Sequence, residues 1–542
     1  MPILTTIIDR YYRTWFRFHP EVAVDAGVAG YAHLLKPYGN DELAALEVLN
    51  EKLISSLDEL DLSSLSQDQQ IDAQLMRSAA VLQLEEYASR DWRLCDPTGF
   101  LPVHAIYQLT IRDVEDKKNA FRERLTAIPA HLRGARSWLE MAPEKIPPIW
   151  LDSAVAEAEG GAIFFRDLKQ HPEINTYRVS EELEHASHAL EDFAAYLKNE
   201  LADKAQGDFA CGREYFDLIL QERHYLNINA DELYDFGAAL FSQTEQELKE
   251  VTKSLSGNDD VDLLMEKIKQ QHPNKENLLD EYRKHMQAAH QFVADNDVVS
   301  LPGKESLKVI ETPAFLQHQI PFAAYYEPSP ADPEQQGYYY VTPPTTDDEL
   351  GEHNLISLKH TCVHEAWPGH HLQFVKANSK ATSSTLPRLL NPSATLYEGW
   401  ALYCEELMHE LGFITEPESR FILLKDRLWR ALRIMIDVGI HTRGLSLEDA
   451  ASLMQEKLGF SHHQAMGDLT WYTQAPGVPM GYATGWALIK DIKRQQIENE
   501  NFNQKTFHDT LLSCGSIALP LAIVRGFGLS SWQEAHQSIF KS

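Results

Sequence analysis

The 542-residue chain has few cysteines, a deficit of positive charge and no long apolar run. Its five cysteines form no close pair and no C-x-x-C, so neither a disulfide framework nor a thiolate zinc site is expected. A reducing, cytoplasmic location fits this pattern best. Nowhere do about 18 apolar residues follow one another. The first apolar stretch soon meets Asp9 and Arg10, so we expect neither a membrane span nor a standard secretion signal.

The charge balance limits the classes of partner. Asp and Glu number 80 and Lys and Arg 49, which gives a net charge of −31. Such an excess of negative charge argues against binding to nucleic acid or to anionic membrane surfaces. A hydrophobic content of 44% is enough for a substantial core in a chain of this length. No pattern in the sequence indicates an oligomeric state.

One short region concentrates the residues of a metal site. Residues 363–371 read VHEAWPGHH, and residues 396–406 read LYEGWALYCEE. Together they supply three imidazoles and two well-placed carboxylates, the groups needed to hold a divalent metal with an open position and a base beside it. The sequence therefore predicts a metal-dependent hydrolase.

The histidine spacing differs from H-E-x-x-H, the helical zinc-protease motif in which two histidines four residues apart share one face. Four residues after His364 comes Pro368, and the next histidines are His370 and His371. Proline has no backbone N–H and Gly369 is unusually free in conformation, so we expect a bulge that loops out two residues. This geometry makes His364 and His370 the ligands. A longer bulge would place His371 on the metal instead.

The third ligand is expected from a separate helix, and Glu398 is the candidate. It begins a stretch, containing Trp400 and Tyr403, that has the pattern of a buried helix. A carboxylate there would be costly to bury unless it bound a cation. Glu405 or Glu406, about two turns further on, could orient a ligand histidine, and a solvated helix face is the alternative.

Other residues are candidates for the chemistry and for substrate binding. Glu365 is the expected general base, which takes a proton from the attacking water and passes it to the leaving amine. Tyr482, in a segment rich in glycine and proline, is the expected hydrogen-bond donor to the oxyanion. Arg433, Asp437 and His441 recur at intervals of four. Arg433 and His441 could bind a substrate carboxylate from this helix face, and a structural ion-pair network is the alternative.

These motifs resemble the DUF885 family of bacterial proteins, which is distantly similar to the gluzincin peptidases. The resemblance runs through most of the chain, from YYRTWFRFHPEVAVDAG through GREYFDLIL and RALRIMIDVGIHTRGLS to APGVPMGYATGWALIK. It implies a largely helical zinc peptidase that holds one Zn²⁺ per chain at His364, one of the following histidines and Glu398. The chain departs from the family pattern at Trp471 and Val478, where arginine and glutamine are usual. The resemblance therefore implies less about substrate recognition than about metal binding.

The apolar pattern predicts a mainly helical protein. Apolar residues recur at intervals of three and four between Leu183 and Leu201, with Ser180 as the expected N-cap. Residues 446–458 follow the same pattern and end at a glycine. Asn229, three residues before Glu232, predicts a capping box for another helix.

The residue pattern of the sequence changes between about residues 300 and 348. Residues 306–312 and 338–342 have the pattern of short strands between proline-rich turns. We therefore expect a small β-sheet next to the metal-binding helix of a large helical, metallopeptidase-like body. We divide this body into a helical N-terminal region, residues 1–300, and a catalytic metal-binding region, residues 301–542.

The sequence as a whole predicts a zinc-dependent hydrolase that cleaves the peptide bonds of small peptides. Two alternatives stay open. A metal and a base do not themselves specify a peptide, so the enzyme could be an amidase acting on a non-peptide or modified amino-acid substrate. A catalytically inactive binding protein of the same fold is the other alternative, and it predicts either no metal or no effect of Glu365→Gln.

Overall fold

A computed structural model describes residues 3–317, 320, 322–379, 384–498 and 501–541. The protein is mainly α-helical, as the sequence predicts, and its described residues include a small three-stranded sheet. Its contacts divide the chain into two compact units. The first comprises Met1–Phe209, Thr312–Pro321 and Ser329–Pro333, and the second comprises Ala210–Glu311, Phe322–Pro328 and Glu334–Ser542. The functional division near residue 300 stays a prediction.

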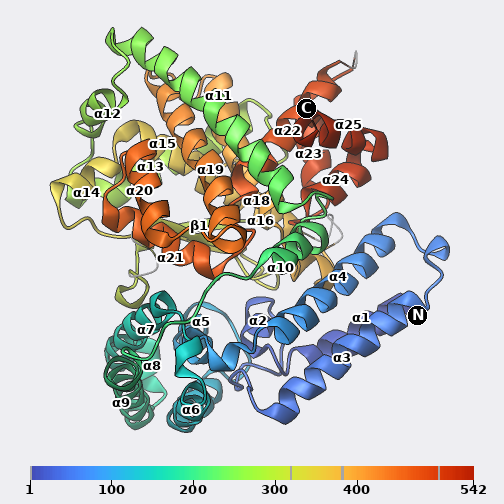
Figure 1. The fold of residues 1–542 in the computed structure, drawn as a ribbon, viewed down its shortest axis with the longest axis vertical. Helices are drawn as coiled ribbons and strands as arrows, with labels where there is room; N and C mark the ends of the chain where they lie inside the picture. The colour runs from blue at the N-terminus through green and yellow to red at the C-terminus, as the bar shows by residue number, and fades with distance from the viewer. Residues whose placement is uncertain (1–2, 318–319, 321, 380–383, 499–500, 542) are drawn as a thin grey trace. The chain divides into compact units, whose positions relative to one another are not determined.

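The first unit is built from helices (Figure 1). Helix α9 packs on α6 and α7, and its Leu183, Leu190 and Phe193 are fully buried, so the predicted stripe is core. The N-cap is Val179 rather than Ser180, because the first helical hydrogen bond already runs to the Val179 carbonyl. The helices of this unit are α1 (Ile3–Trp15), α2 (Pro20–Asp25), α3 (Asn40–Asp58), α4 (Gln67–Ser89), α5 (Val103–Ile111), α6 (Lys117–Leu139), α7 (Pro148–Asp167), α8 (Pro172–Thr176) and α9 (Ser180–Tyr196).

The second unit contains every predicted site residue. Its helices are α10 (Arg213–Leu218), α11 (Ala230–Ser256), α12 (Val261–Lys269), α13 (Leu278–Asp295), α14 (Asp347–Glu352), α15 (Leu355–Glu365), α16 (His370–Asn378), α17 (Leu386–Leu389), α18 (Ala394–Glu410), α19 (Ser419–Thr442), α20 (Leu447–Leu458), α21 (His462–Gln474), α22 (Gly481–Ile497), α23 (Gln504–Leu512), α24 (Leu519–Phe527) and α25 (Leu529–Phe540). The predicted capping box of Asn229 and Glu232 starts α11, and Gly459 ends α20 in the left-handed conformation. Helix α11 packs along α19, and α18 packs on both α15 and α22.

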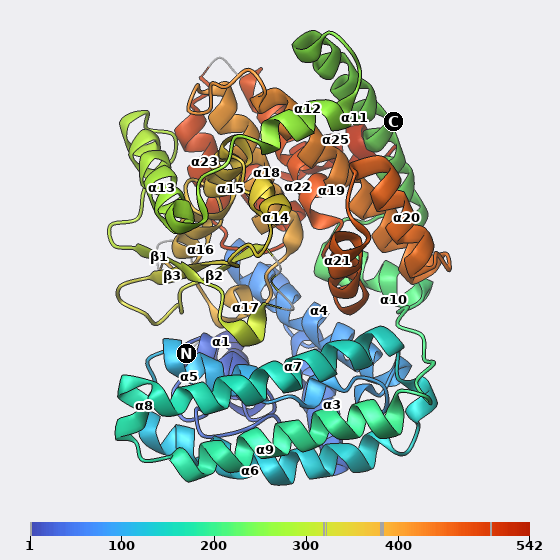
Figure 2. The ribbon, with the colours of Figure 1, turned by 90° about the vertical axis from the view of Figure 1, so that its left-hand side faces the viewer.

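The sheet lies beside the short helix α16 (Figure 2). Strand β1 (Ser306–Glu311) pairs in parallel with β3 (Gln336–Val341), and β2 (Ala323–Tyr326) pairs antiparallel with the other edge of β3. The sequence predicted β1 and β3 but missed β2, whose four residues are too short a run to show alternation. The Tyr325 hydroxyl on β2 lies 3.0 Å from Nδ1 of His371 on α16, which confirms a sheet next to the metal-binding region.

Helices α18 and α22 touch through their backbones. A Cβ atom added to Gly485 of α22 would lie 1.9 Å from the carbonyl oxygen of Thr395 and 2.7 Å from Cα of Gly399, both on α18. Only glycine permits this approach. Because Glu398 lies on α18 and Tyr482 on α22, the contact fixes two predicted site residues relative to each other.

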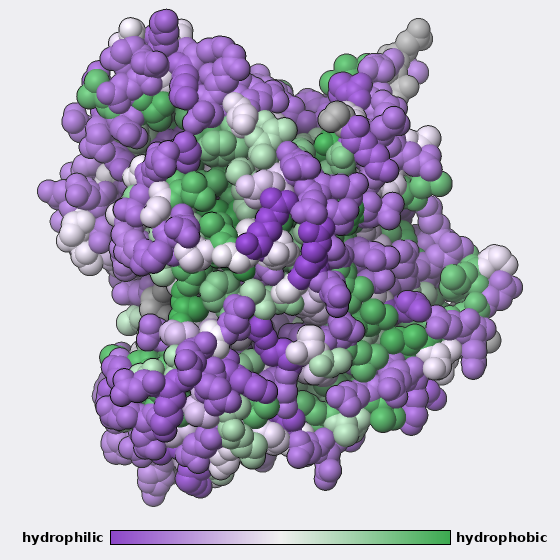
Figure 3. Space-filling model, viewed as in Figure 1, coloured by the Kyte–Doolittle hydropathy of each residue, from purple (hydrophilic) through white to green (hydrophobic). Residues whose placement is uncertain are grey.

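The visible face in Figure 3 is largely hydrophilic, in keeping with the net charge of −31. In the part of the chain that the structure describes, no helix combines the length and the apolar character needed to cross a membrane.

The glycine contact generates a stability prediction. Gly485→Ala should lower the melting temperature, because overpacking between rigid backbones costs about 1–3 kcal/mol. The matched control is Gly467→Ala in α21, where a Cβ atom would meet nothing within 4 Å. This control should leave the melting temperature unchanged or raise it slightly, because alanine favours a helix more than glycine does. Equal melting temperatures for the two variants, measured by circular dichroism, would contradict the proposed contact.

Candidate metal centre

A bulge joins the two helices that carry the histidines. Helix α15 ends at Glu365, and Ala366 leaves helical geometry with φ −112° and ψ −92°. The chain then folds back, so that the Gly369 N–H donates to the Val363 carbonyl at 3.1 Å. A Cβ atom on Gly369 would lie 1.8 Å from the carbonyl oxygen of His364. The bulge expected at Pro-Gly is therefore present, and it requires glycine.

This bulge brings His364 and His370 to the same carboxylate. Oε2 of Glu398 lies 3.4 Å from Nε2 of His364 and 3.2 Å from Nε2 of His370. These three atoms lie within 4.8 Å of one another, and the three side chains form the one such metal-ligand cluster found in the described residues. Each residue is buried, with exposures of 6%, 7% and 8%. Oε2 of Glu398 is buried without a hydrogen bond of regular geometry, as expected of an oxygen suited to a cation.

His371 points away from this cluster. It is fully buried, with Nδ1 at 3.0 Å from the Tyr325 hydroxyl and Nε2 at 3.2 Å from Oε2 of Glu305. Glu305 also accepts a hydrogen bond from the Trp367 indole, at 2.9 Å. These contacts tie the bulge to the sheet, and of the two ligand alternatives the geometry favours His370.

Glu405 orients the first histidine. Its Oε1 lies 2.7 Å from Nδ1 of His364, which turns Nε2 of that ring toward Glu398. Glu406 instead accepts hydrogen bonds from Trp486 and Lys490. The sequence alone did not show which of these two glutamates orients the histidine, because adjacent residues of a helix point in different directions.

The electrostatics around His364 favour positive charge. Burial lowers the pKa of His364, but hydrogen bonds to Glu398 and Glu405 outweigh burial and raise this pKa to about 10. For Glu398, burial raises the pKa, but the charges and hydrogen bonds of His370 and His364 lower it. The net effect is a lowered pKa. Two imidazoles and one carboxylate form a donor set common in catalytic zinc sites, so these residues fit a zinc ion.

Glu365 and Tyr482 lie beside the three donors. Burial raises the pKa of Glu365, and the nearby charges of His364 and His370 oppose this shift. The Tyr482 ring stacks on the His364 ring, with centroids 6.2 Å apart and planes 17° apart. Burial, followed by the charge of Glu398 and a hydrogen bond to it, raises the pKa of Tyr482 well above its usual value. Tyr482 therefore stays protonated and able to donate.

The predicted substrate-binding residues have different surroundings. Nε of Arg433 donates to the Tyr472 hydroxyl at 2.7 Å, and its guanidinium carbon lies 4.7 Å from the Tyr482 ring centroid. His441 is fully buried, with Nε2 3.0 Å from the Tyr472 carbonyl and Nδ1 3.4 Å from the backbone N–H of Cys211. Both side chains are held by contacts within the protein, and the structural ion-pair network and substrate binding by either residue both stay predictions.

Asp437 has a role that the sequence did not reveal. It is fully buried on α19, and its Oδ1 accepts the Gly477 N–H at 3.3 Å. It thus holds the loop that leads into Tyr482. Its Oδ1 lies 3.9 Å from Nε2 of His441, on the face that the spacing suggested. It also accepts a hydrogen bond from a distant loop backbone, which no local spacing could reveal.

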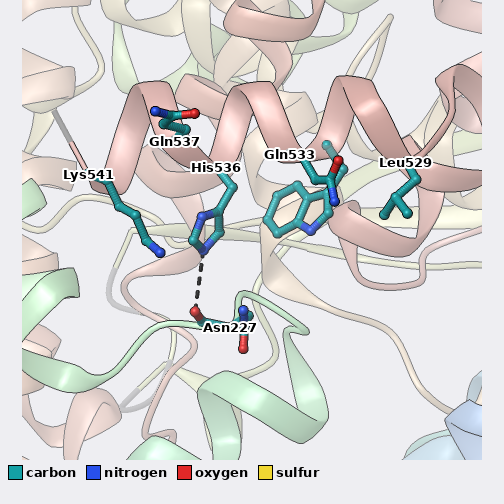
Figure 4. Close-up of a pocket in the computed structure, with 7 residues that line it drawn as sticks. Asn227, Leu529, Gln533, His536, Gln537 and Lys541 are labelled. Atoms are coloured by element: carbon teal, nitrogen blue, oxygen red, sulfur yellow. Dashed lines mark hydrogen bonds between the residues drawn. The ribbon is translucent and has the colours of Figure 1, made fainter.

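A separate pocket of about 560 Å³ lies along α25. In Figure 4, Nε2 of His536 reaches the Asn227 carbonyl, at 3.3 Å. The lining residues are Asn227, Leu529, Trp532, Gln533, His536, Gln537 and Lys541. None of them is a predicted site residue, so this pocket is distinct from the metal centre.

Two solved structures match nearly the whole chain. One, described as "a putative lipoprotein of unknown function from Shewanella oneidensis", is 22% identical with a TM-score of 0.77, over 96% of this chain and 98% of that one. The other, described as "the putative lipoprotein from Colwellia psychrerythraea", is 17% identical with a TM-score of 0.70, over 99% of each chain. These likenesses show a shared fold. A carboxypeptidase from Pyrococcus furiosus is 11% identical over 99% of each chain with a TM-score of 0.42, a likeness too weak to carry an argument.

The two lipoprotein descriptions contradict the cytoplasmic location expected from the cysteines, because lipoproteins are anchored to membranes. The expectation was wrong for a physical reason. A chain of this length buries enough apolar surface to fold without disulfides, so a lack of paired cysteines does not identify the compartment.

No curated protein matches the chain. The family described as "Bacterial protein of unknown function (DUF885)" matches residues 20–525, which confirms the resemblance seen in the motifs. The chain therefore belongs to the DUF885 family of bacterial proteins.

Proposed function

We propose that the protein is a zinc-dependent hydrolase that cleaves the peptide bonds of small peptides. The observation that carries the proposal is the convergence of donor atoms from His364, His370 and Glu398, with Glu365 beside them. A zinc ion held by these residues would supply the Lewis acid that activates a water molecule and polarises the scissile carbonyl.

Glu365 acts as the base and then as the acid. Its carboxylate takes a proton from the attacking water while the water oxygen bonds to the carbonyl carbon. It then gives that proton to the amine as the carbon–nitrogen bond breaks. Burial raises the pKa of Glu365, which brings the carboxyl group closer to the range in which it can both accept and donate a proton.

Tyr482 and Glu405 support this chemistry from either side of His364. The Tyr482 hydroxyl, held beside Glu398, donates a hydrogen bond to the oxyanion of the tetrahedral intermediate. Glu405 bonds Nδ1 of His364, which keeps Nε2 of this ring turned toward the site. Both residues are fixed by helix packing, so the site is organised before substrate binds.

Metal content tests the ligand assignment. Wild-type protein purified without added metal and then dialysed against zinc should hold about one zinc ion per chain. His370→Gln should lose most of this zinc because it removes a ligand. The matched control is His371→Gln, which changes the adjacent, also buried histidine and should retain the zinc. Elemental analysis measures the content, and circular dichroism checks the fold. Zinc lost from His371→Gln but retained by His370→Gln would contradict the assignment.

Glu365→Gln tests the catalytic step. This change should slow the cleavage of a defined mixture of synthetic tripeptides by roughly 10²- to 10⁴-fold, because it removes the proton acceptor. The zinc content should not change. Glu410→Gln, at an exposed site on α18, is the control and should cleave like wild type. Mass spectrometry follows the products. Undiminished cleavage by Glu365→Gln, or no cleavage by zinc-loaded wild type, would contradict the proposal.

A further inference from the structure

Tyr397 presents a hydroxyl group beside the metal centre. It precedes Glu398 on α18, and its ring packs against His370 and Phe374 with centroid distances of 6.2 Å and 5.8 Å. The side chain is only partly buried. Among the described residues its hydroxyl has no hydrogen-bond partner, so it is able to donate to a bound molecule.

Arg223 lies next to the start of α18, the helix that carries Tyr397. It ends the π-helical turn Ile219–Arg223, and the next residue, His224, is completely buried. Nδ1 of His224 lies 2.9 Å from Oγ of Ser393, the N-cap of α18. This bond fixes the turn beside the helix start that carries Tyr397, and Arg223 is among the charges that act on Tyr397.

Arg223 differs from Arg213, the nearest other arginine in the chain, in having no ion-pair partner among the described residues. Acidic residues outnumber basic ones by 80 to 49, so carboxylate partners are plentiful in this chain. Arg213, ten residues earlier and also exposed, pairs with Asp231 at 2.7 Å. No carboxylate in the described ranges pairs with Arg223. Its guanidinium group is therefore available to an anionic ligand.

Arg433, the cation expected from the sequence, is less available. Its Nε is bonded to the Tyr472 hydroxyl, and its Nη2 lies 3.4 Å from Oδ2 of Asp468. The rings of Trp429 and Tyr482 lie against the same guanidinium group. A substrate carboxylate would have to displace these contacts, whereas no carboxylate of the described residues pairs with Arg223.

We propose that Arg223 and the Tyr397 hydroxyl bind the free terminal carboxylate of a short peptide. An arginine matches a carboxylate with two parallel hydrogen bonds, and the phenol adds a third donor. The Tyr397 ring packs against the ring of His370, with centroids 6.2 Å apart. A carboxylate held beside Tyr397 therefore favours cleavage close to the carboxyl end of the peptide. This inference rests on the proposed function and names its substrate class.

Retention of peptides by inactive protein tests the carboxylate site independently of turnover. Zinc-loaded Glu365→Gln is mixed with synthetic tripeptides in two forms, one with a free carboxyl end and one with a C-terminal amide. Ultrafiltration followed by mass spectrometry measures how much of each form is retained. The carboxylate form should be retained roughly ten- to a hundred-fold better, the effect of a charge-assisted hydrogen-bond pair.

A second substitution, added to Glu365→Gln, identifies the residues that bind the carboxylate. Adding Arg223→Gln or Tyr397→Phe should reduce this preference, Arg223→Gln nearly to equality, while zinc content and melting temperature stay unchanged. Arg213→Gln is the matched control, an exposed arginine on the preceding helix, and should keep the full preference. Equal retention of the two forms, retention of neither, or a preference that survives Arg223→Gln would overturn the inference. If the carboxylate form is preferred but wild type cleaves no peptide, the carboxylate site is supported and the hydrolase proposal is contradicted.

Discussion

The candidate site depends on the contact between Gly369 and the backbone carbonyl of His364. A side chain at position 369 would lie 1.8 Å from that oxygen, so only glycine lets the chain fold back after α15. The fold-back turns His370 toward His364 although it lies six positions further along the chain. It also sends His371 to Glu305 and Tyr325, which anchors the bulge to the sheet. One backbone contact thus brings His370, rather than His371, to the candidate site and positions the loop that carries it.

The same principle holds the other half of the site. Gly399 and Gly485 let α18 and α22 meet backbone to backbone, which places Glu398 next to Tyr482. Around this framework, Glu398 and Glu405 are buried beside His364. Burying two carboxylates is costly unless positive charge compensates them, and protonated imidazole or a divalent cation can supply that charge. The pKa of His364, raised to about 10 by hydrogen bonds that outweigh burial, reflects this demand. Zinc would compete with that proton.

The sequence predicted what local pattern controls. The histidines, Glu398 and the bulge could be inferred because a proline-glycine pair interrupts a known motif, and the helices followed from apolar periodicity. Contacts between distant segments could not be inferred in this way. Tyr325 and Glu305 meet His371 from outside its helix, and Asp437 holds a loop that begins forty residues later. The cytoplasmic location failed because cysteine content reports on the need for disulfides, which a large core removes.

The most direct test of the central claim is the X-ray absorption spectrum at the zinc edge of the zinc-loaded protein. The proposed ligands predict scattering from two imidazoles and a low-atomic-number carboxylate shell, with zinc–nitrogen and zinc–oxygen distances of about 2.0–2.2 Å. They predict no sulfur shell, because every ligand is a histidine or a glutamate. Three imidazoles, or a sulfur shell at about 2.3 Å, would contradict the account, since either would require ligands other than His364, His370 and Glu398.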